Sequence, residues 1–361
     1  MNRKLYYRSI LYLCMLLPGM LLGQETVSKQ IEESRDFSVN GSLLIENKYG
    51  DIYVQGWDQD ELAITIDISA TDNDPKEAQA LLDRIRPTIS GSGNQVIITS
   101  EIAKKEAGLV ERFFNRSKSG GKKAKSQIDI TVYLPNNARV VLTNKYGDVI
   151  VSDWDGNLEA TVEHGDIRLP DALDSSELSI KYGKLKASAL TTAKIMANNA
   201  TVDVSNATQL NVESKNSEFT LGDIASLTLD SNKDEIEITS MGAISGYVTY
   251  SNVVLDNVTE SINLNLNLAE LRVMKFSDPA PNVRVDQENS EVYMNILNTS
   301  FRFRANLEQG VLRIPKTMQD INSTLLDKKK KIRDISATYG SEKQTVFSFT
   351  GRKGVIILKE L

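Results

Sequence analysis

Carboxylate side chains recur at one place in a repeated pattern along the middle of this sequence. Each follows a short polar turn, and the six are Asp148, Asp166, Glu218, Glu235, Glu270 and Glu291. If the segments that carry them stack, adjacent carboxylates lie about 4.8 Å apart, the spacing of neighbouring strands. Such a column could hold calcium, which takes six to eight oxygen ligands, or could supply a pair of acids for polysaccharide cleavage.

Basic residues favour a charge-paired column over a calcium site. Lys184 and Thr201 interrupt the series of acids. Four further lysines lie beside it, namely Lys145, Lys181, Lys215 and Lys233. The sequence also lacks the Gly-Gly-x-Gly-x-Asp pattern of calcium-binding β rolls. We expect a solvated, partly charge-paired ladder and no cofactor, with calcium as the alternative and Asp148 and Asp166 as candidate ligand contacts.

Other signs of an enzyme are missing from the sequence. The lone histidine, His164, occupies the turn position that Tyr49, Tyr146 and Tyr182 hold in sister turns, which indicates a turn substituent. No nucleophile elbow, phosphate loop or zinc-ligand spacing occurs. We predict a protein that is not an enzyme, and the alternative is a carbohydrate-active hydrolase or lyase that uses two stacked carboxylates.

Trp57 and Trp154 are the remaining candidate ligand contacts, because an exposed indole can stack on a sugar ring. Each follows the strand that comes after an Asn-Lys-Tyr-Gly-Asp segment. This equivalent placement favours packing at a corner of the fold. The sister positions are simply apolar, at Ala172, Ala189 and Ile224.

The elements that would position these residues form an internal repeat. "NKYGDIYV" begins at Asn47 and "NKYGDVIV" at Asn144, and the second copy opens a regular series. Its anchor residues lie 18, 18, 17, 17 and 17 residues apart, at Gly147, Gly165, Gly183, Ala200, Ser217 and Asp234. Each unit holds two alternating strands, and a unit this short buries its apolar face only against stacked neighbours. The period predicts an all-β, single-chain β-solenoid with about 17–18 residues per repeat, rather than a meander of antiparallel hairpins.

Glycine is expected to bend the chain at the turns. The glycines concerned are Gly50, Gly147, Gly165 and Gly183. We predict a positive φ at the anchor, which glycine adopts without a Cβ clash. Later units replace glycine by Ala, Ser or Asp after an Asn or Lys, which leaves the shape of their turns open.

Residues 1–23 are predicted to be a signal peptide, because basic residues precede an apolar run. The run is shorter than the roughly 20 residues of a membrane span, so that we expect no transmembrane segment in the mature chain, with a retained anchor as the alternative. The only cysteine, Cys14, lies in this run and leaves no disulfide. Bulky residues before it disfavour a lipoprotein cysteine.

The mature chain is predicted to have three regions. Residues 24–135 are irregular and β-rich, with one short helix near 75–86 and a mobile polar insertion near 103–126. Residues 136–315 carry the solenoid repeats. Residues 316–361 form a C-terminal cap that is partly helical.

The formal net charge of −6 argues against a nucleic-acid-binding surface, which needs a basic excess. Two basic stretches, "KSGGKKAK" near Lys118 and "DKKKKIR" near Lys328, are interpreted as solvated loops.

The two Asn-Lys-Tyr-Gly-Asp turns, their trailing tryptophans and the later "KYG" repeat resemble the bacterial putative-adhesin family of β-strand-repeat domains, which is related to GIN-type adhesin head domains. The resemblance covers about Phe37 to Pro315. It implies a β-solenoid outside the inner membrane and no catalytic residues.

We therefore expect an exported, adhesin-like protein of the periplasm, cell surface or medium. Its partners would be proteins or polysaccharides of the cell envelope or the extracellular space. A structural or envelope-stress scaffold is the remaining alternative.

Overall fold

The computed structural model describes residues 25–38, 40–103, 124–341 and 344–361. The described residues contain 25 strands and a single helix, so that the expected all-β class is confirmed. The strands belong to one long mixed sheet that does not close on itself. The predicted signal peptide and almost all of the predicted insertion near 103–126 lie outside the described residues.

The chain divides into two compact units. Unit 1 takes its described residues from Met1–Gln30, Asp67–Arg86 and Ile102–Gln127. Unit 2 comprises Ile31–Ile66, Pro87–Glu101 and Ile128–Leu361. Three long strands contribute residues to both units, namely β1 (Glu25–Asp36), β4 (Glu61–Asp72) and β7 (Lys125–Pro135).

Unit 1 contains the helix, α2 (Pro75–Leu82). The Asp74 side chain caps it by accepting a hydrogen bond from the Lys76 backbone N–H, and Pro75 occupies its first turn, where the missing N–H costs nothing. Lys29 Nζ donates to the backbone carbonyls of Leu82 and Ile85, so that a cation lies where the helix ends. The helix predicted near 75–86 is therefore present but four residues shorter.

The first strands of unit 2 come from distant parts of the chain. They are β2 (Ser42–Lys48), β3 (Ile52–Trp57), β5 (Thr88–Ser92), β6 (Gln95–Thr99), β7 (Lys125–Pro135), β8 (Arg139–Lys145), β9 (Val149–Ser152) and β10 (Asn157–Glu163). Strand β2 pairs with β8 in parallel, with Asn47 opposite Asn144, and β3 pairs with β9. The two copies of Asn-Lys-Tyr-Gly-Asp therefore lie side by side.

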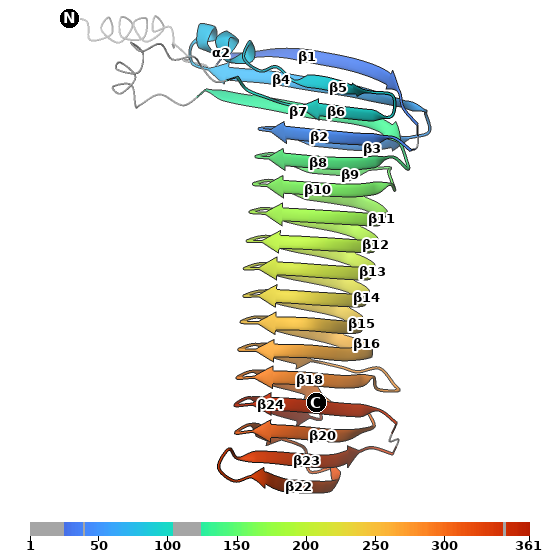
Figure 1. Cartoon of the computed structure of the whole chain (residues 1–361), viewed down its shortest axis with the longest axis vertical. Helices are drawn as coiled ribbons and strands as arrows, with labels where there is room; N and C mark the ends of the chain where they lie inside the picture. The colour runs from blue at the N-terminus through green and yellow to red at the C-terminus, as the bar shows by residue number, and fades with distance from the viewer. Residues whose placement is uncertain (1–24, 39, 104–123, 342–343) are drawn as a thin grey trace, which may run out of the picture. The chain divides into compact units, whose positions relative to one another are not determined.

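Six long strands form the regular part of unit 2. They are β11 (Ile167–Lys181), β12 (Lys184–Asn198), β13 (Thr201–Lys215), β14 (Glu218–Asn232), β15 (Glu235–Thr249) and β16 (Asn252–Asn267). They follow one another in chain order (Figure 1). Each pairs with the next in parallel, so that Lys184 lies opposite Thr201 and Thr201 opposite Glu218. The meander of antiparallel hairpins is excluded for these strands, because their pairing is parallel.

The core of unit 2 consists of inward-facing side chains in columns that cross the repeats. One column is Leu185, Val202, Phe219, Ile236 and Val253, each at most 1% exposed. Polar side chains alternate with them along each strand and face outward. Burial of one such apolar side chain contributes about 1.5–3 kcal/mol to folding. A repeat thus gains its core only from its neighbours.

The C-terminal part of unit 2 is less regular. Its strands are β17 (Glu270–Val273), β18 (Asn282–Glu288), β19 (Glu291–Asn295), β20 (Phe301–Glu308), β21 (Val311–Arg313), β22 (Gln319–Asp327), β23 (Ile332–Tyr339), β24 (Val346–Arg352) and β25 (Val355–Lys359). The last strands return into the sheet, since β24 pairs with both β18 and β20. The helical part predicted for the cap after residue 315 is wrong, because β22 and β23 form an antiparallel hairpin. β-branched residues within both strands, such as Ile321 and Ile332, fit this pairing.

Candidate functional site

The asparagine of each Asn-Lys-Tyr-Gly-Asp segment lies inside unit 2. Asn47 is 5% exposed and Asn144 is fully buried. Asn144 Nδ2 donates to the carbonyl oxygens of Gly50 (2.9 Å) and Asp148 (3.1 Å), and Asn47 Nδ2 donates to those of Gly50 and Ile128. These bonds join the two turns to each other and to β7 through buried amide groups. This role is not among the predictions from the sequence, although the asparagine occurs at the same place in both copies of the motif.

The aspartates of the candidate column bind backbone amides of the neighbouring turn. Asp148 Oδ1 accepts the Asp166 N–H at 2.9 Å, and Asp166 Oδ1 accepts the Lys184 N–H at 2.9 Å. In the same way, Asp51 Oδ1 accepts the Asp148 N–H and Asp129 Oδ1 accepts the Asp51 N–H, each at 2.8 Å. One oxygen of each carboxylate therefore serves to hold adjacent turns together.

The second oxygen of these two aspartates faces a cation. Arg168 Nη2 lies 2.8 Å from Asp148 Oδ2 and 3.4 Å from Asp166 Oδ2. Further along the column, Glu235, Asn252, Glu270 and Glu291 lie in register. Asn252 Nδ2 donates to both carboxylate oxygens of Glu235, and Arg272 pairs with Glu270. Charge pairing along the column thus matches the expected ladder. Among the described residues, no group of three or more His, Cys, Asp or Glu is placed to hold a metal ion.

The turns after Gly183 use a different acceptor for the same purpose. There the acceptor is the polar side chain of the next anchor residue, and Ser217 Oγ accepts the Ala200 N–H at 3.3 Å. Ser251 Oγ accepts the Asp234 N–H at 2.9 Å, and Ser290 Oγ accepts the Ala269 N–H at 3.1 Å. The later units therefore keep the link between turns without glycine.

Asp234 is the most buried carboxylate among these turns, with an exposed fraction of 2%. Its Oδ1 accepts the Ser217 N–H at 2.8 Å. Its Oδ2 accepts hydrogen bonds from the hydroxyls of Ser214 and Ser231, both at 2.7 Å, and from the Asn232 N–H. Four donors thus compensate a charge that has no ion-pair partner among the described residues.

The anchor glycines are required by space rather than by backbone angle. Positive φ is found one residue earlier, at 62° for Tyr146, 59° for His164 and 57° for Tyr182. The prediction of positive φ at the anchor is therefore wrong for Gly147, Gly165 and Gly183. A Cβ at Gly165 would lie 1.9 Å from the carbonyl oxygen of Gly147. A Cβ at Gly183 would lie equally close to the carbonyl oxygen of Gly165, and a Cβ at Gly50 would lie 2.0 Å from that of Ile128.

The rings at these positive-φ residues form a column of their own. Tyr49, Tyr146, His164 and Tyr182 stack in succession, with ring centroids 5.4, 5.0 and 4.9 Å apart. His164 is thus a turn substituent, as predicted. Because the rings cover one another's faces, the exposed part of the inner two is their edges, and these offer no flat surface to a sugar.

An ion-pair network flanks this ring column. Glu163 lies 3.0 Å from Lys145 Nζ and 3.7 Å from Lys181 Nζ. The hydrogen bond from Lys145 holds the pKa of the Glu163 carboxyl below its ordinary value. Lys181 Nζ also lies 5.1 Å from the centroid of the Tyr182 ring.

The two candidate tryptophans occupy different environments. Trp154 is 2% exposed and packs against Gly156, so that its ring presents no face to a ligand. Trp57 is half-buried, donates from Nε1 to the Glu61 carbonyl at 2.8 Å and lies against the Tyr133 ring. Of the two tryptophans, Trp57 is therefore the one whose side chain is partly accessible to a ligand.

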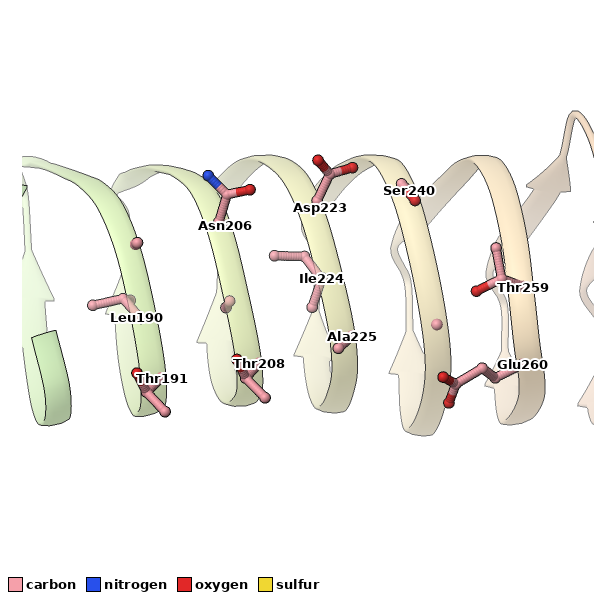
Figure 2. A pocket seen from close by; sticks show the side chains of 13 residues that line it. Leu190, Thr191, Asn206, Thr208, Asp223, Ile224, Ala225, Ser240, Thr259 and Glu260 are labelled. Carbon is pink, nitrogen blue, oxygen red and sulfur yellow. The ribbon is translucent and has the colours of Figure 1, made fainter. Parts of the chain in front are cut away.

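A shallow groove crosses the repeats β12 to β16 (Figure 2). Its volume is about 400 Å³. Small and polar side chains line it, among them Thr191, Asn206, Thr208, Asp223, Ala225 and Ser240. In Figure 2, Asn206, Asp223 and Ser240 project from successive strands at one level, and Thr191, Thr208 and Ala225 form a second row. The groove is an open surface that offers hydroxyl, amide and carboxylate groups at a regular spacing.

The comparisons with known proteins find likeness in solved structures alone. No protein-family model and no curated protein matches the chain. The chain is similar to a putative adhesin from Parabacteroides merdae at 9% identity and a TM-score of 0.33, with 93% of this chain and 97% of that one covered. A putative adhesin from Bacteroides fragilis is 12% identical over 92% and 97% of the two chains, with a TM-score of 0.24.

A third similar structure is a putative cell adhesion protein from Clostridium sporogenes, at 10% identity and a TM-score of 0.18, with 92% of this chain and all of that one covered. All three structures are named for adhesion, as is the family that the sequence resembles. At these identities they transfer no residue role to the chain. No helix among the described residues is long and apolar enough to cross a membrane.

Proposed function

We propose that the protein is an exported, non-enzymatic β-solenoid that binds partners of the cell envelope or the extracellular space, as an adhesin does. The solenoid is supported by parallel pairing at a constant offset of 17 or 18 residues, with two-residue connections between strands. Such a stack has much exposed surface for its length, which suits binding of extended partners. Export is supported by the predicted signal peptide.

The groove over β12 to β16 carries this proposal. It is open along its length, and its polar groups recur at the spacing of the strands, about 4.8 Å. A polymer that lies along the stack meets the same kind of hydrogen-bonding group at each repeat. The partner class that this favours is a polysaccharide or an extended protein segment of the envelope.

Binding to isolated cell envelopes and to a polysaccharide panel tests the proposal. Thr208→Arg/Ala225→Arg fills the groove with two exposed side chains and should weaken binding at least about tenfold. Thr220→Arg/Thr228→Arg on the outer side of β14 is the matched control and should leave binding unchanged. Equal binding by the wild type and both variants would contradict a role for the groove.

An enzyme that uses the column aspartates is the rival hypothesis, and it is disfavoured by their bonds. Asp148 and Asp166 each give one oxygen to a backbone N–H and the other to Arg168. Neither is therefore free to act as acid or nucleophile without breaking a turn. If the protein released new reducing ends from a polysaccharide, and Asp148→Asn or Asp166→Asn abolished this turnover, the non-enzymatic proposal would fail.

A further inference from the structure

The hairpin formed by β22 and β23 has an exposed apolar strand. β22 pairs with β23 on one side only and has no other partner strand among the described residues. Ile321, Leu325 and Leu326 are 55%, 46% and 59% exposed. Single exposed apolar residues are common, but three large ones on a nine-residue strand give this strand an unusually apolar exposed surface.

Four consecutive lysines follow this strand directly. Lys328, Lys329, Lys330 and Lys331 make the turn to β23, and all are exposed. None of the four lysines forms an ion pair with a described residue. Arg333 follows on β23, exposed and bonded to the Ser323 hydroxyl at 3.4 Å.

The turn that presents the lysines is well defined. Asp327 Oδ1 accepts the Lys330 N–H at 2.9 Å, and Lys331 has a φ of 56°. The Lys331 carbonyl accepts the Gln309 N–H from the end of β20. The cationic groups are therefore held next to the apolar patch by backbone bonds and do not depend on a partner for their position.

A cavity of about 540 Å³ lies between the hairpin and the preceding strands. Its lining includes the apolar side chains of Leu307, Leu312 and Ile335 and the cationic side chains of Lys331 and Arg333. Leu325 lies opposite Arg333 in the pairing register and so shares its face of the hairpin. Apolar and cationic groups thus alternate over one small region of the surface.

We propose that this hairpin binds the surface of an anionic lipid bilayer. Clustered lysines attract anionic headgroups, and neighbouring aliphatic side chains enter the boundary between headgroups and acyl chains. The net charge of the whole chain is −6, so that an anionic surface repels the chain as a whole and attracts it at basic segments such as the lysine turn. This surface is separate from the groove over β12 to β16.

A second copy of the chain is a poorer occupant of the same surface. Pairing of two β22 edges would need an uninterrupted strand, but the register shifts between Gln319 and Asn322 and again between Leu325 and Asp327. Such bulges bend an edge strand and restrict further pairing. They do not hinder insertion of side chains into a lipid surface.

Vesicle sedimentation tests the proposal with the chain that begins at Gln24, because the apolar residues before it would bind lipid by themselves. We expect binding to vesicles that contain phosphatidylglycerol and little binding to vesicles of phosphatidylcholine alone. Binding should fall as salt rises from about 0.01 M to about 1 M, since the screening length shrinks from about 30 Å to about 3 Å. Equal binding to both kinds of vesicle, or none to either, would overturn the proposal.

Two variants locate the surface. Lys328→Gln/Lys329→Gln/Lys330→Gln should weaken binding to phosphatidylglycerol vesicles at least about tenfold. Lys184→Gln/Lys186→Gln/Lys215→Gln removes the same charge from exposed lysines on other strands and should weaken it less than about twofold. The proposal is overturned if the two triple variants bind alike.

Leu325→Ser/Leu326→Ser tests the apolar part separately. It should weaken vesicle binding while thermal melting stays close to that of the wild type, because both side chains are exposed in the free protein. Sedimentation velocity without lipid tests whether a second copy of the chain occupies this surface. We expect a monomer, and a dimer that the leucine variant dissociates would overturn the proposal. Groove variants and hairpin variants affect different assays, so that this proposal and the proposed function can fail independently.

Discussion

At the residue scale, the turns of unit 2 solve one hydrogen-bonding problem in two ways. A backbone N–H of each of these turns finds its acceptor on a neighbouring turn. Up to Gly183 the acceptor is the aspartate after the anchor, as in Asp148 and Asp166. For the N–H groups of Ala200, Ser217, Asp234 and Ala269, it is the side chain of the next anchor.

Gly165→Ala should destabilise the protein by about 1–3 kcal/mol or more, because its Cβ would overlap the Gly147 carbonyl oxygen. Chemical denaturation measures the loss. Ala200→Gly is the matched control at a turn that already accommodates a Cβ, and it should cost about 1 kcal/mol or less. A Gly165→Ala protein as stable as the wild type would show that the turns can separate.

Asp234→Asn should cost about 1–3 kcal/mol, since the amide would turn an N–H₂ group toward hydrogen-bond donors. Asp234→Ser should cost less, because Ser251 and Ser290 already perform the same bond at sister positions. Thermal melting of the two variants compares them. The assignment is contradicted if serine is the worse replacement.

At the scale of the elements, the alternation of buried and exposed positions along each strand determines which substitutions are tolerated. β11 shows it clearly, with Ile167 and Leu169 buried and Arg168 exposed between them. Parallel neighbours repeat the pattern in register, so that one inward position is shared by several strands. A polar group placed there meets apolar side chains from both neighbouring repeats.

Ile167→Asp should therefore destabilise the protein by more than about 3 kcal/mol, because Ile167 is fully buried and the carboxylate would have no partner. Thr161→Asp introduces the same group at an exposed position of β10 and should change stability by less than about 0.5 kcal/mol. Denaturant midpoints of both variants check this. Similar losses for the two would show that the inner face is wet.

The C-terminal strands are tied together by Tyr339, whose hydroxyl donates to Glu360 Oε1 at 2.7 Å. Burial, and then this bond, raise the pKa of Tyr339 to about 12 from 10.0. Because the folded pKa lies above the unfolded one, the contribution is present below pH 10.0 and is lost as the pH rises to about 12. The phenolate absorbance that Tyr339→Phe removes should appear near pH 12, and a midpoint near 10.0 would contradict this.

At the scale of the whole molecule, the repeat was the most predictable feature. The spacing of the anchors equals the offset of the paired strands, as Lys184, Thr201 and Glu218 show. Alternation of apolar and polar residues identified the buried face for the same reason. Periodicity along a chain is local information, and stacking converts it directly into register.

Other features depended on contacts that no local pattern records. Glycine can serve a positive φ or a close backbone approach, and only the position of the Gly147 carbonyl shows which applies at Gly165. The segment after residue 315 lies outside the regular repeat, and its conformation is determined by the pairing of β23 with the distant strand β20.

The column of acids also leads to a prediction for the whole molecule. Addition of calcium or of a chelator should leave the melting temperature unchanged, because Arg168 and backbone amides already satisfy Asp148 and Asp166. A calorimetric scan with and without calcium measures this. A calcium-dependent rise that Asp148→Asn removes would instead establish an ion in the column.

The constant offset between β12, β13 and β14 means that the chain can be shortened or lengthened in whole steps. Excision of residues 201–217 would bring Lys184 opposite Glu218 and leave every inward side chain facing inward. Loss of a single residue would instead turn the buried side chains of the rest of that strand outward. Natural variants of this protein should therefore differ in length by multiples of one repeat.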